Sequence, residues 1–360
     1  MNFDFNDEQQ AIKSAAREML GKRYTLEEVR RLAEDVDAAG YGDDRWAELA
    51  ALGWPGIFVA EDHGGQGLGI VELVILQEEL GYALAPTPFF SNACAGLVLE
   101  AAGDDAQRER WLAPLAAGEK RGTLAVHDSD APSAMDGFTL TADGGRLTGT
   151  KIAVADAAAA DFLIVGERDA PWLLDARADG VTVTPTPGLD PTRRLYEVRL
   201  EGAEGEPLPR EGPELGRALD AIATALAAES VGVAQRAMEM AVDYAKERRQ
   251  FGTPVGAFQA VSHRCAQMLL EVEGARSVTY HAAWALDHEP ATAALASSMA
   301  KAYASDAGWR VTASALQVHG GIGFTWEHDL HFFLKRAKAN AHAFGDSRWH
   351  RARVADLAGV

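Results

Sequence analysis

The sequence predicts a mainly α protein with a small central β domain. Three observations support this fold class. Residues 1–118 repeat apolar side chains at helical spacing, residues 119–212 alternate with a period of two, and residues 213–360 return to long helical patterns. We therefore predict an N-terminal all-α domain, a middle antiparallel β-barrel or sandwich, and a C-terminal four-helix bundle. A chain of 360 residues has room for two or three such units.

The first predicted domain begins with a capped helix. Asn6 is suited to the N-cap, and Ile12 and Met19 lie on one face of the helix that follows. Thr25 offers a second N-cap, and Gly53 stops a third helix. Helices are expected over 8–21, from 25 onward, and over 45–52, 70–80 and 104–117.

The middle domain is predicted from short alternating runs rich in β-branched and aromatic residues. Turn signals such as Asp143-Gly144-Gly145 separate these runs. Strands are expected over 123–126, 138–142, 146–154, 162–166, 172–175, 181–185 and 195–200.

The last domain is predicted to be a bundle, because four long helical patterns follow Pro213 with short loops between them. A shorter helix is expected at the C-terminal end. The expected ranges are 215–248, 256–287, 290–317, 327–343 and 346–358.

Composition indicates which classes of binding partner, cellular location and metal site the sequence favours or argues against. A net charge of -19 argues against binding to nucleic acid or to an anionic membrane surface. No apolar run is long enough to cross a membrane, and the acidic N-terminus lacks the features of a signal peptide, so we expect a cytoplasmic protein. Cys94 and Cys265 fit no metal or redox spacing, and His328 with His331 is the best histidine pair. We predict no metal site.

Two stretches at the ends of helical patterns offer what a pyrophosphate needs. In the stretch 247–259, Arg248 or Arg249 supplies a planar fork of donors. In the stretch 317–324, glycines let a ligand approach backbone N–H groups, and Gln317 adds an amide. Taken alone, the arginine pair is more typical of a solvated helix end, and the glycine pair is more typical of a plain helix C-cap.

Taken together, the two stretches resemble the acyl-CoA dehydrogenase family, and the resemblance covers essentially the whole chain. It implies FAD as the cofactor and an acyl-CoA thioester as the substrate, with each FAD shared between two subunits. Family members remove hydrogens from the α and β carbons of the thioester, using a carboxylate base and the flavin. By resemblance, the pyrophosphate and adenosine are held by Arg248, Gln250, Phe251, Gln317, Gly320 and Gly321.

The side of the site that holds the flavin ring departs from the family pattern. Residues 127–134 replace a Thr-Glu-Pro-Gly-Ala-Gly-Ser-Asp run, and residues 153–155 read Ala-Val-Ala where relatives have Trp-Ile-Thr. The two family positions for the catalytic base hold Phe344 and Ile222. Asp346 is a conceivable substitute base, although it also suits the cap of the last helix. No catalytic residue is predicted.

This asymmetry predicts the non-catalytic subunit of a heteromeric acyl-CoA dehydrogenase, paired with a homologous catalytic subunit in a heterotetramer. By resemblance, such enzymes commonly act on bulky acyl groups such as degraded sterol side chains, within fatty acid or sterol side-chain degradation. One alternative is a self-sufficient homo-oligomer whose unconventional base is Asp128, Glu229 or Asp346. A flavin-dependent monooxygenase and a scaffold without flavin are the others. The intact phosphate-binding motifs argue against the scaffold.

Overall fold

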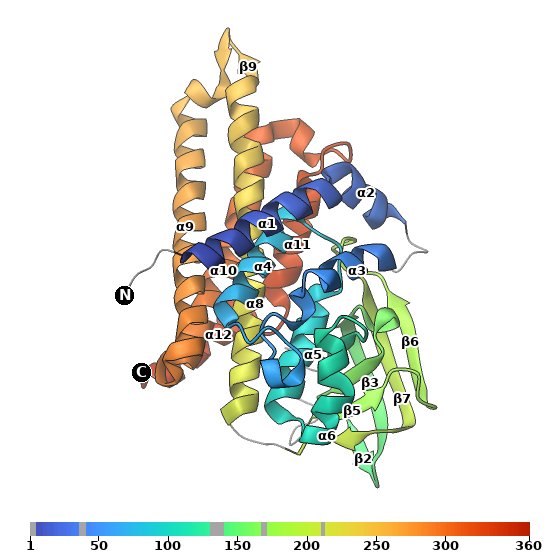
Figure 1. The fold of residues 1–360 in the computed structure, drawn as a ribbon. Helices are drawn as coiled ribbons and strands as arrows, with labels where there is room; N and C mark the ends of the chain where they lie inside the picture. The colour runs from blue at the N-terminus through green and yellow to red at the C-terminus, as the bar shows by residue number, and fades with distance from the viewer. Residues whose placement is uncertain (1–4, 36–40, 130–139, 167–170, 210–212) are drawn as a thin grey trace. The chain divides into compact units, whose positions relative to one another are not determined.

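The computed structural model describes the chain except for five short segments (Figure 1). The chain divides into two compact units, which we call the bundle unit and the sheet unit. The bundle unit comprises Met1–Arg31, Val74–Ala85 and Ala223–Val360, and the sheet unit comprises Leu32–Leu73 and Pro86–Ile222. The segments outside the description are 1–4, 36–40, 130–139, 167–170 and 210–212.

Long helices build the bundle unit. Its central helix α10 packs against α9, α11 and α12, and most of the residues that α10 buries are small. Small side chains let helix axes approach closely, which suits this alanine-rich sequence. The helices are α1 (Asp7–Arg23), α8 (Pro213–Glu247), α9 (Gln259–His288), α10 (Pro290–His319), α11 (Leu330–His342) and α12 (Ser347–Ala358), with 3-10 turns η5 (Val255–Ala257) and η6 (Gly320–Phe324).

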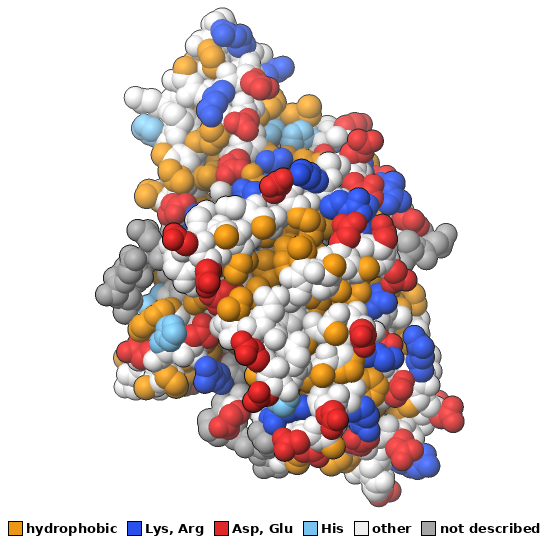
Figure 2. Space-filling model, viewed as in Figure 1, with side chains coloured by type: hydrophobic (Ala, Val, Ile, Leu, Met, Phe, Trp, Pro, Cys, Tyr) orange, Lys and Arg blue, Asp and Glu red, His pale blue; other side chains and the backbone are white. Residues whose placement is uncertain are grey.

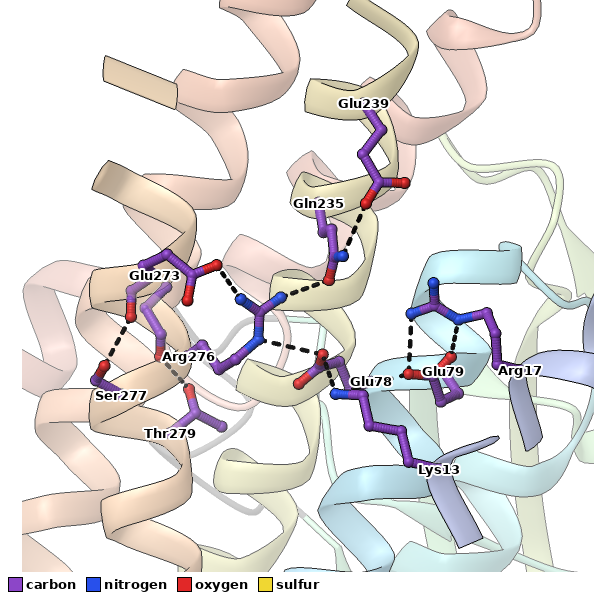
Figure 3. A network of polar contacts seen from close by, with 11 residues as sticks. Lys13, Arg17, Glu78, Glu79, Gln235, Glu239, Glu273, Arg276, Ser277 and Thr279 are labelled. Carbon is purple, nitrogen blue, oxygen red and sulfur yellow. Dashed lines mark hydrogen bonds and ion pairs between the residues drawn. The ribbon is translucent and has the colours of Figure 1, made fainter. Parts of the chain in front are cut away.

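A buried ionic network ties α1 to helix α4 (Ile70–Ala83) and to α9 (Figure 3). Glu78 and Glu79 of α4 are fully buried. Lys13 Nζ lies 3.0 Å from Glu78, Arg276 Nε lies 3.3 Å from the same carboxylate, and Arg17 pairs with Glu79. Each buried carboxylate therefore has a cationic partner, as burial of a charge requires.

The sheet unit combines short helices with two sheets. Helix α5 is buried along almost its whole length, so it forms the centre of the helical part. The remaining helices are α2 (Leu26–Glu34), which begins in the bundle unit, α3 (Asp43–Ala51), α5 (Phe89–Ala102), α6 (Asp105–Gln107), a π-turn η3 (Arg108–Leu112), α7 (Ala113–Ala116), and 3-10 turns η1 (Trp54–Gly56), η2 (Glu61–His63) and η4 (Ala157–Ala159).

Two four-stranded sheets share one core in this unit. Their strand orders are β1-β4-β5-β8 and β2-β3-β7-β6. Leu147 and Val198 from the second sheet are buried with Leu163 and Leu174 from the first. The strands are β1 (Gly122–Ala125), β2 (Thr141–Asp143), β3 (Arg146–Ala155), β4 (Phe162–Val165), β5 (Trp172–Asp175), β6 (Val181–Thr186), β7 (Leu195–Glu204) and β8 (Glu206–Pro207).

The predicted fold class is confirmed, with two differences in detail. The predicted helices and strands overlap the observed ones, but helix α5 was not foreseen, because a helix buried all round shows no apolar stripe. Strands β1 and β4 pair in parallel, whereas the prediction was antiparallel throughout. The start of the strand predicted at 138–142 lies outside the described residues. Among the helices described, none is both long and apolar enough to span a membrane.

Candidate functional site

A hairpin projects from the end of α8, where Figure 1 labels β9. Its strands, β9 (Arg249–Gln250) and β10 (Thr253–Pro254), are joined by Phe251 and Gly252, whose φ angles are +53° and +80°. Positive φ at both residues defines a tight hairpin turn, and such a conformation costs free energy in a non-glycine residue. Phe251 is nevertheless 95% exposed, and its ring meets Phe258 edge-on at 6.3 Å. The turn therefore holds an aromatic ring out in solvent.

The polar side chains of this hairpin are equally exposed. Arg248, Arg249 and Gln250 all face solvent, and neither arginine forms an ion pair with another described residue. The backbone around them is fixed, because the Arg248 N–H donates to the Tyr244 carbonyl at 2.8 Å and its carbonyl accepts from Val255 N–H at 2.7 Å. Basic and hydrophobic side chains show at this projecting end in Figure 2. The hairpin is thus a rigid platform with unused donors.

The glycine stretch lies where α10 ends. Gly320 has φ +65° and ψ -141°, a combination accessible essentially only to glycine. A Cβ built on Gly320 or Gly321 would meet no atom within 4 Å, so the space beside both residues is open. Gly323 differs, because a Cβ there would lie 2.9 Å from the His319 Cβ. The first two glycines leave the backbone accessible, and the third is needed for packing.

The structure brings the two predicted motifs to the same end of the bundle unit. Tyr244, one turn before Arg248, stacks on His319 with ring centroids 4.6 Å apart and an angle of 26°. His319 immediately precedes Gly320, and its Nδ1 lies 2.9 Å from the Ala315 carbonyl. Burial lowers the pKa of His319, so the ring is neutral at pH 7. This aromatic pair is a packed link between the arginine hairpin and the glycine turn.

This end of the bundle unit fits the diphosphate and adenosine half of a dinucleotide. It offers two free guanidinium groups, an open glycine backbone and exposed aromatic side chains, which are the groups that bind phosphates and stack on bases. Gln317 is exposed on the last turn of α10. Further exposed apolar side chains beside it are Ile322, Phe324 and Trp326.

In the region of the sheet unit expected to hold the flavin ring, several polar groups are paired with one another. Asp128 and Lys151 form a buried ion pair with an N–O distance of 2.6 Å. A register shift in β3 leaves Ala153 exposed with φ +52°. The carbonyl of Ala155 accepts from Thr123 Oγ1 at 2.6 Å. Only methyl groups are presented at 153 and 155, so these two side chains do not fit a hydrogen-bonded flavin ring. Of the run 127–134 that departs from the family pattern, residues 130–134 lie outside the described residues.

The position predicted for the family base lies in a turn clamped from two sides. Phe344 has φ +54°, and its carbonyl accepts from His350 Nε2 at 2.9 Å. Lys301, fully buried, donates from Nζ to the Gly345 carbonyl at 2.9 Å and to the Asn340 carbonyl at 3.0 Å. The turn is therefore ordered, but the side chain it carries has no basic atom. The second base position, Ile222, is buried within α8.

The three carboxylates considered as substitute bases all have other partners. Asp346 is the N-cap of α12 and accepts from the Trp349 N–H at 2.8 Å. Glu229 is buried, with Arg336 Nη1 at 2.6 Å and Asn340 Nδ2 at 3.1 Å. Asp128 is held by Lys151, as described above. A carboxylate paired with a buried cation is a poor proton acceptor, because the cation favours its ionised form.

Comparison with known proteins identifies the family. Residues 6–119 match the family model of the acyl-CoA dehydrogenase N-terminal domain, and residues 215–358 match that of the C-terminal domain. Acyl-CoA dehydrogenase IpdE2 from Mycolicibacterium smegmatis is 32% identical over 352 residues, covering 97% of this chain and 98% of that protein. This chain therefore belongs to the acyl-CoA dehydrogenase family, whose members are FAD-dependent oxidoreductases acting on CH–CH donors.

Solved structures resemble the whole chain. The Tcur3481-Tcur3483 steroid ACAD variant has a TM-score of 0.89 and 29% identity, with 98% of each chain covered. The ChsE4-ChsE5 complex from Mycobacterium tuberculosis has a TM-score of 0.90 and 25% identity, covering 100% of this chain and 99% of that one. The predicted family and its cofactor FAD are confirmed.

Some features of the site were not predicted from the sequence. The Asp128–Lys151 ion pair and the Lys301–Gly345 hydrogen bond join residues 23 and 44 positions apart in the chain, and the His350–Phe344 hydrogen bond spans six. No motif spacing signals any of them. A lysine within an apolar alternating strand, as at Lys151, was an available hint of a buried partner.

Proposed function

We propose that this chain is the non-catalytic subunit of a heteromeric FAD-dependent acyl-CoA dehydrogenase. Its bundle unit would hold the ADP half of a flavin whose ring lies in a homologous catalytic subunit. The observation that carries this proposal is the contrast between the hairpin at Arg248–Phe251, whose donors are free, and the turn at Phe344, where the base is absent. We further propose that residues 1–118, 119–212 and 213–360 are its three domains.

In this proposal each binding residue has a distinct part. Arg248 pairs with the pyrophosphate, while Gly320 and Gly321 let the phosphate oxygens approach the backbone. Gln317 adds a neutral amide, and Gln250 with Phe251 covers the adenosine. FAD, when bound, supplies hydride acceptance, and the partner supplies the carboxylate that removes the α-proton.

A bulky, sterol-derived acyl-CoA is the substrate class we propose for the complex. The similarity to a structure named as a steroid ACAD, and to one named as a complex of two proteins, supports both the substrate class and the heteromeric state. A homo-oligomer with an unconventional base and a monooxygenase are less favoured. The first lacks an unpaired carboxylate among the candidates named above, and the second would need the same ring-binding side chains.

Purification of the chain alone and after co-expression with a homologous acyl-CoA dehydrogenase tests the proposal. The chain alone is expected to be colourless, and the co-purified complex is expected to contain both subunits in equal numbers with bound flavin. Absorbance near the flavin bands and the subunit ratio are the readouts. A yellow lone chain that oxidises an acyl-CoA would refute the division of labour.

A second variant sharpens this test. Phe344→Glu places a carboxylate on the clamped turn, and we expect it to create no dehydrogenase activity in the lone chain, because the ring site is not rebuilt. Activity gained by this single change would show that the chain seats its own flavin.

A further inference from the structure

A cavity of about 390 Å³ in the bundle unit has no part in the function proposed above. It lies among α1, the start of α2, the end of α4 and α8. Leu20, Leu26 and Ala83 give it an apolar side, and Arg17 and Arg236 give it a cationic side. A pocket with one apolar and one charged end is suited to an amphipathic ligand.

The guanidinium groups of Arg17 and Arg236 each lie over the aromatic ring of Tyr82. Arg17 Cζ is 3.5 Å and Arg236 Cζ is 5.3 Å from the ring centroid. The Tyr82 hydroxyl accepts from Arg236 Nη1 at 3.2 Å and donates to Glu239. Stacking against the ring restrains both guanidinium groups, so less conformational freedom is lost when a ligand binds.

The two arginines differ in how their charge is balanced. Arg17 donates hydrogen bonds from Nε and Nη2 to the Glu79 carboxylate, which leaves Nη1 without a hydrogen-bond acceptor in the described part of the chain (Figure 3). Arg236 donates to the neutral phenol of Tyr82 and forms no ion pair with any described residue. Glu239, the nearest carboxylate in this chain of contacts, instead accepts from Tyr82 and from Gln235 Nε2 at 2.8 Å.

Other charges around the cavity are already paired. Glu79, the carboxylate in the cavity wall, forms ion pairs with Arg17 and with Lys13, whose Nζ lies 3.7 Å away. Arg236 is half-buried, and a half-buried cation without a carboxylate partner attracts an anion more strongly than an exposed one, because water screens it less. Arg236 and Arg17 both line this cavity.

We propose that this cavity binds a small organic carboxylate with an apolar body, for which hexanoate is a suitable probe. The carboxylate would accept hydrogen bonds from Arg236 and from Arg17 Nη1, and the hydrocarbon would lie against Leu20, Leu26 and Ala83. A planar guanidinium matches a carboxylate with two parallel hydrogen bonds. The site is separate from the hairpin at Arg248 and from the turn at Phe344.

Calorimetric titration of the full chain with hexanoate, in complex with its partner if the lone chain is unstable, tests this site. We expect Arg236→Met to weaken hexanoate binding about tenfold or more, as loss of a charge-assisted hydrogen bond predicts. Arg264→Met on α9 removes an arginine that does not line the cavity and should leave the affinity unchanged. A crystal grown with 6-bromohexanoate should show the bromine in the cavity.

Two ligand comparisons keep the test decisive if Arg236→Met does not fold. Hexylamine, with the same chain and opposite charge, should not bind, and acetate should bind at least about tenfold more weakly than hexanoate because it buries fewer methylenes. Three outcomes would each overturn the proposal. The Arg236→Met and Arg264→Met variants could bind hexanoate equally well, hexylamine could bind as tightly as hexanoate, or the crystal could show bromine only outside this cavity.

Discussion

The arginine side chains at the projecting end of the bundle unit are exposed and unpaired within the described residues, whereas the charged groups described in the region of the sheet unit expected to hold the flavin ring are buried and paired. At the hairpin, Arg248 and Arg249 are exposed without ion-pair partners among the described residues, and Phe251 extends into solvent. In the sheet unit, Lys151 and Asp128 satisfy each other in a buried pair. The first region is incomplete until another molecule covers it, whereas the second is complete within the chain.

Under the proposed function, this difference indicates that the chain provides the phosphate-binding half of a shared site. Exposed donors and exposed aromatic rings contribute little to the stability of the isolated chain, so we propose that they serve a ligand or a partner. A self-satisfied ion pair needs no ligand. Variants in the two regions should therefore change different quantities.

The largest expected effect is on the stability of the sheet unit. Lys151→Met leaves the Asp128 carboxylate buried beside an apolar side chain, which should lower the free energy of unfolding by about 3–5 kcal/mol. Denaturant unfolding followed by circular dichroism measures this. The double variant Asp128→Asn with Lys151→Met should recover much of the loss. A loss below about 1 kcal/mol would mean that the pair is not structural.

At the hairpin, the expected effect is on cofactor affinity alone. Arg248→Met in the co-purified complex should weaken FAD binding by about tenfold or more, since one charge-assisted contact is lost. The melting temperature of the chain without FAD should not change, because Arg248 makes no side-chain ion pair within the described residues. Flavin released on ultrafiltration is the measurement, with Arg264→Met as the control. Unchanged retention would remove Arg248 from the proposed site.

The clamp on the base-less turn predicts a pH dependence. Burial lowers the pKa of His350 from about 6.5 to about 4. The unfolded chain therefore binds the proton more readily between these values, and this group makes the folded state less stable as pH falls from 6.5 to 4.

The size of that effect follows from the shift. At pH 5, His350 should reduce the free energy of unfolding by roughly 2 kcal/mol relative to pH 8. His350→Gln should flatten this part of the profile, although it should also be less stable at pH 8. Melting curves of both proteins across this range provide the check, and parallel profiles would contradict the role assigned to His350.

The smallest expected effect is a difference between alanine substitutions at two nearby glycines, Gly321 and Gly323. Gly321→Ala meets no atom within 4 Å, so it should leave stability unchanged and weaken FAD binding several-fold by blocking the backbone. Gly323→Ala places a Cβ 2.9 Å from that of His319 and should lower the melting temperature instead. Thermal melts and flavin retention of both variants test this pair. If both substitutions lowered stability equally, the open space at Gly321 would have no role in binding.

The same physical distinction explains how much could be predicted from the sequence. Apolar periodicity, together with segment length and turn signals, located the helices of the bundle and most strands. It missed α5, whose faces are all buried. It also gave no sign that β1 would pair in parallel with β4, because β2 and β3 of the other sheet separate them in the sequence. Local sequence patterns indicate local geometry. They do not indicate which strands or helices a segment will pack against.

The candidate site followed the same rule. The hairpin and the glycine turn are short, contiguous motifs, so the sequence indicated them, although the Tyr244–His319 contact that joins them was not foreseen. The hydrogen bonds from His350 to the Phe344 carbonyl and from Lys301 to the Gly345 carbonyl depend on how α12 and α10 pack around the turn, and they had no local signal. Whether Arg248, Gln250, Phe251, Gln317, Gly320 and Gly321 bind FAD stays a prediction until the variants above are measured.

The left-handed conformation of Phe251 has a consequence for assembly. Phe251 is held at φ +53° by a two-residue turn, so it does not have to be ordered when a second protein binds. The conformational entropy that a flexible loop would lose on binding is lost here during folding instead. Docking at this point should then proceed close to rigid-body encounter, with little lag between collision and a seated complex.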